Sequence, residues 1–127
     1  MSKRTGVLSV VVADEHDFFA RGRRLAALAD AGKPIPHEKT ISFGDPADLL
    51  KMLTPARLEL VGEVKRTPDS ITGIAGRLHR DRAAVKRDVD RLEAMGILSV
   101  ESRVLPGHGR MKFVNVPAMK LRLMAEI

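Results

Sequence analysis

The chain has 127 residues, of which 44% are hydrophobic, with four Phe and no Trp, Tyr or Cys. This length suits about one domain, or a small domain with an appendage, packed from aliphatic side chains. Without cysteine the chain cannot form disulfides, thiolate zinc sites or cysteine nucleophiles. Its 22 basic and 16 acidic residues give a net charge of +6, which fits either a nucleic-acid binder or a well-solvated surface. No stretch approaches the roughly 18 apolar residues of a membrane span and no signal-peptide pattern is visible, so we expect a cytoplasmic protein.

The first part of the chain predicts a strand, a helix and a second strand. Residues 6–13 are almost continuously apolar, as in a strand that is buried on both faces. Asp14 is the expected N-cap of a helix that ends at Gly32, and residues 38–43 alternate like a second strand. Two strands and one helix rarely bury enough surface to be stable alone, so we expect them to pair with other strands, within or between subunits.

The apolar run followed by Asp14 and Glu15 resembles the start of response-regulator receiver domains, in which such a carboxylate pair holds magnesium beside a phosphorylated aspartate. A receiver also needs a phosphate-accepting aspartate on a third strand and a later lysine, and residues 1–44 are too few to supply them. Negative charge is favourable at a helix N-terminus. We therefore interpret the two residues as the start of a helix and expect no metal site.

Capping residues and prolines divide the next segment into helices. Asp45-Pro46 and Thr54-Pro55 each place a capping side chain before a proline at the first helical position. The second of these helices is predicted to run to about Arg66, before Pro68 interrupts the chain.

Two further helices joined by a tight turn are predicted after this break. Ser70 and Asp81 are the expected N-caps, and Gly96 is the expected end of the second helix. His79 and Arg80 form the turn. A positive φ at His79 is tolerated better by His than by most residues.

A β-hairpin is predicted to follow. Strands at 97–104 and 111–116 flank a tip at 105–110 that contains Pro and Gly. Two short helices that cross tightly, followed by a hairpin, match winged helix-turn-helix geometry. Residues 119–125 alternate apolar and charged at their start, which favours a strand, with a helix as the open alternative.

Residues 45–116 resemble the winged helix-turn-helix domains of bacterial and archaeal transcriptional regulators of the MarR/ArsR type. The resemblance rests on LTPARLEL at 53–60, IAGRLHRD at 74–81 and VKRDVDRLEAMGIL at 85–98. It is closest to a group of predicted MarR-like regulators, some of which resemble antitoxins. The resemblance implies a homodimeric regulator that binds double-stranded DNA sequence-specifically and acts as a repressor or autorepressor. Whether a cognate toxin is also a partner is left open by the sequence.

The predicted fold class is therefore α+β, with three parts. Residues 45–116 form the winged helix-turn-helix domain, and residues 1–44 form a strand–helix–strand extension that serves dimerisation. Residues 117–127 add a strand to that extension. Winged regulators commonly read two half-sites with two-fold symmetry, which supports the dimer.

The expected DNA contacts come from the second helix and the hairpin. Because Val85, Val89 and Leu92 face inward, the first turns of that helix project basic residues outward. The residues expected to contact DNA are Arg80, Arg82, Ala83, Lys86, Arg87, Arg103, His108, Arg110 and Lys112.

Their roles follow from side-chain chemistry. Arg82 or Arg87 can bind guanine in a bidentate manner, and Ala83 can contact a thymine methyl group. Arg80 and Lys86 can hold phosphates instead, and the residues of the hairpin reach the backbone or the minor groove.

Other functions fit the residues less well. The charge run at 77–91 read alone fits a solvated helix face, because three Asp offset half of its six positive charges. A winged domain can also dock onto proteins without DNA, and this is the alternative to DNA binding. RNA binding favours exposed aromatic residues, which are lacking. The four His are scattered without metal-ligand spacing and no nucleophile–base pair is visible, so we expect no enzyme, cofactor or metal.

Overall fold

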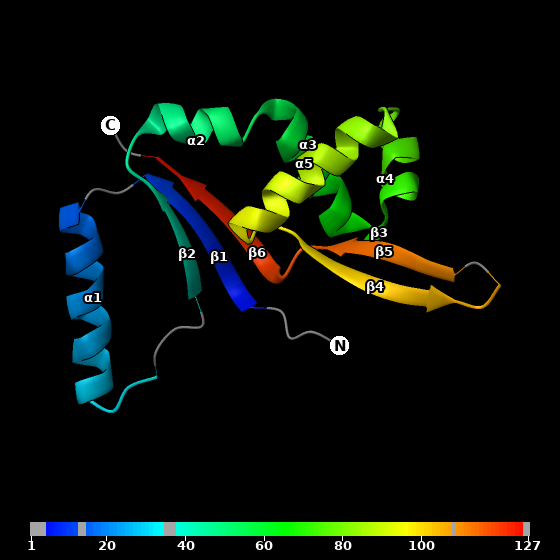
Figure 1. The fold of residues 1–127 in the computed structure, drawn as a ribbon. Helices are drawn as coiled ribbons and strands as arrows, with labels where there is room; N and C mark the ends of the chain where they lie inside the picture. The colour runs from blue at the N-terminus through cyan, green and yellow to red at the C-terminus, as the bar shows by residue number, and fades with distance from the viewer. Residues whose placement is uncertain (1–4, 13–14, 35–37, 108, 126–127) are drawn as a thin grey trace. The chain divides into compact units, whose positions relative to one another are not determined.

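The computed structural model describes residues 5–12, 15–34, 38–107 and 109–125 (Figure 1). The described residues form five helices and two three-stranded sheets, a mixed α+β architecture. Their contacts separate two compact units, described one at a time below. No helix within the described ranges is both long and apolar enough to cross a membrane.

The first unit, here the parallel-sheet unit, comprises Thr5–Met52 and Ala118–Ile127. Its elements are β1 (Thr5–Val12), α1 (Glu15–Asp30), β2 (Glu38–Phe43), α2 (Pro46–Met52) and β6 (Ala118–Met124). The strand order is β2-β1-β6, and both neighbours run parallel to β1, with Val10 opposite Ile41 and Leu123. Strands of parallel sheets are commonly buried on both faces, which explains the continuous apolar run of this central strand.

Burial within the sheet follows from the central place of β1. Leu8, Ser9 and Val10 are buried, whereas residues of the edge strand β6 such as Met119 and Leu123 are largely exposed. The C-terminal segment is thus a strand and not the alternative helix, and it pairs within the same chain. The predicted cap Asp14 lies outside the described residues.

Helix α2 belongs to the parallel-sheet unit, so the contacts divide the chain at Leu53 and not at residue 45. The reason is that α2 packs beside β2 and buries Leu49. Its start matches the sequence: the backbone N–H of Ala47 donates to Asp45 Oδ1 at 2.8 Å, and Pro46 occupies the first helical position.

The second unit, here the helical unit, comprises Leu53–Pro117. Its elements are α3 (Pro55–Arg66), β3 (Asp69–Ser70), α4 (Ile71–Leu78), α5 (Arg82–Met95), β4 (Ser99–Leu105) and β5 (Gly109–Asn115). The sheet is antiparallel with order β3-β5-β4. Apolar residues from all three helices and the hairpin form its core: Leu60, Val64, Ile74, Val85, Val89, Leu92, Ile97, Leu98 and Val114.

The short strand β3 is an addition that the sequence did not predict. Asp69 and Ser70 pair with Val114 and Phe113 of β5, immediately before α4 begins. This pairing attaches the start of α4 to the hairpin. It therefore fixes the position of one helix end relative to β5.

Candidate nucleic-acid interface

Side-chain caps start both helices of the predicted helix-turn-helix. The Gly73 N–H donates to Ser70 Oγ at 3.1 Å at the start of α4, and the Ala84 N–H donates to Asp81 Oδ2 at 3.1 Å at the start of α5. Each bond satisfies one of the backbone donors that a helix N-terminus leaves free. Both N-caps that the sequence predicted are confirmed.

The turn between α4 and α5 depends on His79. Its φ is +53°, the one positive φ among the described residues other than glycine. The N–H of Arg80 donates to the carbonyl of Ala75 at 3.0 Å, which closes the end of α4. The predicted turn at His79 and Arg80 is confirmed, and its left-handed residue lets α5 begin after only three intervening residues.

A cluster of three charged residues fastens α5 to the rest of the unit. Asp88 of α5 accepts from Arg57 Nε at 3.0 Å and from a terminal nitrogen of Arg80 at 2.8 Å. The three side chains are only 13% (Arg57), 15% (Asp88) and 25% (Arg80) exposed. Burial raises the pKa of Asp88, but the hydrogen bonds from Arg80 and Arg57 more than offset this, so its pKa lies below the usual range.

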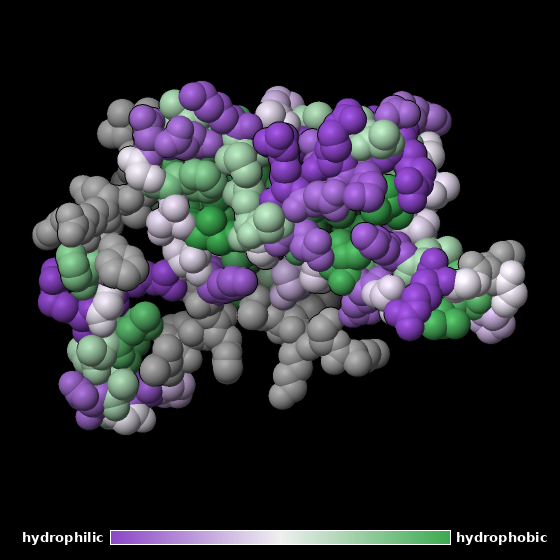
Figure 2. All heavy atoms as spheres, in the orientation of Figure 1, coloured by the Kyte–Doolittle hydropathy of each residue, from purple (hydrophilic) through white to green (hydrophobic). Residues whose placement is uncertain are grey.

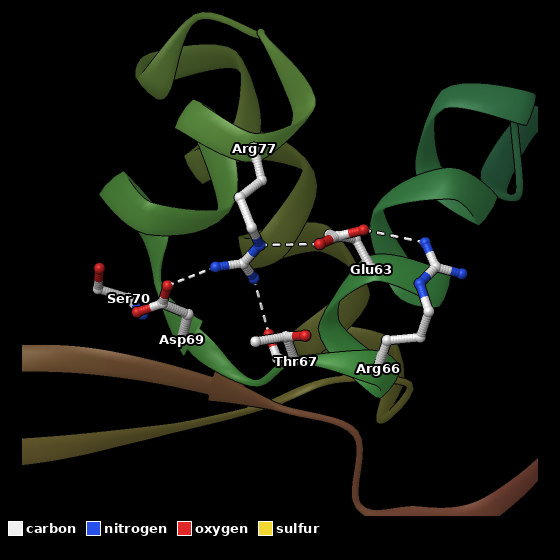
Figure 3. A network of polar contacts seen from close by, with 6 residues as sticks. All are labelled: Glu63, Arg66, Thr67, Asp69, Ser70 and Arg77. Atoms are coloured by element: carbon white, nitrogen blue, oxygen red, sulfur yellow. Dashed lines mark hydrogen bonds and ion pairs between the residues drawn. The ribbon is translucent and has the colours of Figure 1, made fainter.

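A second network, drawn in Figure 3, holds α4 against α3 and β3. Arg77 donates to Glu63 Oε1 at 2.8 Å, to Asp69 Oδ2 at 2.6 Å and to the carbonyl of Thr67 at 2.8 Å. Hydrogen bonds from Arg77 and then Arg66 lower the pKa of Glu63. Because three of its donors are committed to this network, Arg77 serves the fold.

A basic cleft of about 550 Å³ opens where the starts of α4 and α5 meet β5. Its lining residues are Ser70, Ile71, Thr72, Arg82, Lys86, Arg110, Met111 and Lys112. Four of them are cations that the sequence predicted as DNA contacts, and none is acidic. The fold thus gathers side chains from α5 and the hairpin into one positively charged surface.

Two of the cations in the basic cleft have a neighbour that orients them. Arg82 Nε donates to Thr72 Oγ1 at 3.0 Å, across from α5 to α4. Lys86 Nζ donates to Asp90 Oδ2 at 2.8 Å, one turn further along α5. The first contact joins two helices, and the second lies within one helix.

The other predicted residues lie outside the lining of the basic cleft. Ala83 and Arg87 are exposed on α5, and the Arg87 side chain makes no hydrogen bond or ion pair with any described residue. Arg80 is bound to Asp88 in the cluster above. Arg103 stacks on the Phe113 ring, 3.7 Å from its centroid. His108 lies outside the described residues.

The hydroxyl residues Ser70 and Thr72 belong to the lining of the basic cleft, and sequence reasoning missed them as site residues. Ser70 was predicted only as a cap. No sequence signal identifies them, because the first turn of α4 meets the hairpin through β3, which has no sequence pattern of its own.

Polar residues dominate the part of the surface formed by α4 and α5 in the view of Figure 2. The buried side of α5 carries Val85, Val89 and Leu92, at the spacing of one helix face. The opposite side is therefore free to contact a charged partner.

Comparisons with known proteins find a similar solved structure and a protein family. One solved structure, described as a "possible transcriptional regulator" from Methanosarcina mazei Go1, is 20% identical. The match covers 60% of this chain and 72% of that chain, with a TM-score of 0.47. No curated protein matches. The sequence matches the HVO_A0114 family over residues 52–123, which is more than half of the 127 residues, so the chain belongs to the HVO_A0114 family.

Proposed function

We propose that this protein is a transcriptional regulator that binds double-stranded DNA sequence-specifically, and that it acts as a repressor. Helix α5 enters the major groove, and the β4–β5 hairpin acts as a wing along the backbone or minor groove. The observation that carries the proposal is the basic cleft, in which cations of α5 and β5 converge without an acidic residue in the lining. A dense positive surface suits a polyanion.

The exposed side of α5 supports this reading beyond its charge. Its first two turns present Arg87 without an internal partner and Ala83 without bulk. A free guanidinium can approach a guanine edge, and a small side chain allows close approach to the groove floor.

The test is the triple variant Arg82→Ala, Lys86→Ala, Arg87→Ala. Binding is measured by fluorescence anisotropy on a duplex enriched from a random library by the wild-type protein. We expect affinity to fall at least about tenfold at fixed salt, because phosphate and base contacts are lost together. The charge-matched control is Arg24→Ala, Lys33→Ala, Lys65→Ala, three exposed positions outside the basic cleft, which should change affinity little. If the first variant stays folded and binds with full affinity, docking onto a protein becomes the leading function.

We further propose that the protein is a homodimer that associates through the parallel-sheet unit. Apolar side chains remain exposed on this unit, with Phe19 54%, Met119 67%, Leu123 43% and Met124 48% exposed. Parallel sheets are usually covered on both faces, and a second copy would provide such cover. A two-fold dimer would also match two half-sites on DNA.

Light scattering at micromolar concentration should report about twice 13.9 kDa. Leu123→Lys should shift the protein towards monomer, because a charge would be buried in the interface. Lys65→Ala, an exposed change in the helical unit, is the control. A monomeric wild-type protein that still binds its selected duplex tightly would exclude the dimer.

A further inference from the structure

The helical positions of the basic residues on α5 separate them into two faces. An α-helix turns about 100° per residue, so Arg82 and Lys86 lie only about 40° apart, whereas Arg82 and Arg87 lie about 140° apart. The structure agrees with this division, because Arg82 and Lys86 line the basic cleft and Arg87 does not. The two arginines of the first turns therefore lie on different sides of α5.

The hydrogen bond from Arg82 to Thr72 fixes the orientation of the Arg82 side chain. Arg82 Nε is used by Thr72 Oγ1 at 3.0 Å, so the four N–H donors of the two terminal nitrogens remain free. A guanidinium anchored in this way presents a planar fork, the geometry that binds phosphate in a bidentate manner. Since Thr72 belongs to α4, the anchor holds the side chain across the basic cleft.

The remaining lining of the basic cleft matches the same ligand. Arg110 and Lys112 come from β5, and Lys86 comes from the next turn of α5. The carboxylate bonded to Lys86 is that of Asp90, which is not part of the lining. Cations from two elements therefore surround a space that contains hydroxyl groups and no competing anion.

We propose that the basic cleft is a phosphate clamp that holds a DNA backbone phosphate, with Arg82 as a phosphate ligand positioned by Thr72, and that Arg87 is the residue that reads a base. The proposal rests on the DNA-binding function above and specifies which arginine gives affinity and which gives specificity. Arg82 contributes to binding of every sequence, whereas Arg87 contributes to the preference between sequences.

The test compares Arg82→Ala and Arg87→Ala on the selected duplex and on a scrambled duplex, across a salt series. Arg82→Ala should weaken both duplexes by the same factor, about tenfold, and reduce the salt slope by about one unit. Arg87→Ala should weaken the selected duplex by about tenfold more than the scrambled one, since a lost base contact acts only on the correct base. If Arg82→Ala instead changes base preference, the clamp is wrong while the DNA-binding function stands. Loss of all duplex binding by the wild-type protein would reject both.

Thr72→Val tests the positioning step, because it removes the hydroxyl and keeps the shape. It should weaken both duplexes a few-fold without changing the salt slope, and it should have no further effect in the Arg82→Ala protein. An equal effect in both backgrounds would show that Thr72 does not act through Arg82. Circular dichroism confirms that each variant is folded.

Two experiments distinguish a DNA backbone phosphate from a free phosphorylated ligand. Single methylphosphonate substitutions along the selected duplex should identify a position whose neutralisation weakens the wild-type protein but not Arg82→Ala. In the other arm, inorganic phosphate and pyrophosphate are titrated without DNA, and we expect no saturable binding at millimolar concentration. Saturable binding that Arg82→Ala abolishes, without any sensitive backbone position, would make the basic cleft a site for a free phosphorylated ligand and overturn the proposal.

Discussion

Asp88→Ala is expected to lower the free energy of unfolding of the helical unit by about 3 kcal/mol. The change leaves two guanidinium groups, Arg57 and Arg80, poorly solvated and without their shared carboxylate, at 13% and 25% exposure. Arg80 is affected most, because its Nη1 is already buried without a hydrogen-bond partner in the described structure. Losing one partner of a buried ion cluster costs more than the pair contributes, since the remaining charge is stranded.

The measurement is urea unfolding followed by circular dichroism, with amide hydrogen exchange to separate the helical unit from the parallel-sheet unit. Asp90→Ala is the matched control, two residues along the same helix, where a 51%-exposed carboxylate pairs with Lys86. An exposed pair of this kind contributes less than about 1 kcal/mol. Equal effects of the two substitutions would show that burial of the Asp88 cluster has no energetic consequence.

The contribution of Asp88 to the free energy of unfolding should disappear in acid. Its folded-state pKa lies below the ordinary value, so the stabilisation is fully present above about pH 4 and is lost as the pH falls through the folded-state pKa. The difference in stability between the wild-type protein and Asp88→Ala should therefore shrink in acid. A difference that stays constant from neutral pH to below pH 3 would contradict this account.

Local signals predicted the helix boundaries of the helical unit well. Ser70 and Asp81 could be predicted as caps because a short polar side chain before an apolar helical pattern can accept a hydrogen bond from a backbone N–H of the first turn. His79 adopts the left-handed conformation that a two-helix turn requires. These features depend on residues within one turn of each other, so the sequence alone contains the needed information.

Long-range pairings could not be predicted in the same way. Arg80 and Arg103 looked like free cations beside the predicted DNA surface, but one is bonded to Asp88 and the other stacks on Phe113. Asp88 lies on the next helix and Phe113 on the paired strand, and charge counting does not identify such partners. The boundary at Leu53 has the same origin, since α2 packs with a strand that precedes it.

The basic cleft depends both on local spacing and on tertiary pairing. The spacing of Arg82 and Lys86 alone predicts that they lie on one face of the helix. Their meeting with Arg110 depends on β3, which pairs only two residues with β5 and has no sequence pattern of its own. The composition of the basic cleft therefore followed from the tertiary structure.

Gly73→Ala should have opposite effects on stability in two backgrounds. In the wild-type protein an added Cβ would lie 2.6 Å from the carboxyl carbon of Asp69, so the carboxylate would have to move. That carboxylate accepts from the Ser70 N–H and from Arg77, each at 2.6 Å, and moving it disturbs both bonds. We expect a loss of about 1 kcal/mol in the free energy of unfolding, because the two disturbed hydrogen bonds outweigh the gain in helix propensity.

With Asp69→Ala in place, the same substitution meets no carboxylate. Alanine is then favoured over glycine in helix α4 by roughly 0.5–1 kcal/mol, because glycine loses more backbone freedom on folding. Gly73→Ala should therefore stabilise the Asp69→Ala protein while destabilising the wild-type protein. Urea unfolding of the four proteins measures the coupling directly, and hydrogen exchange of the α4 amides assigns it to this helix. Additive effects of the two substitutions would mean that Gly73 is not required by the close approach of Asp69, and that the start of α4 is held to β3 by other contacts.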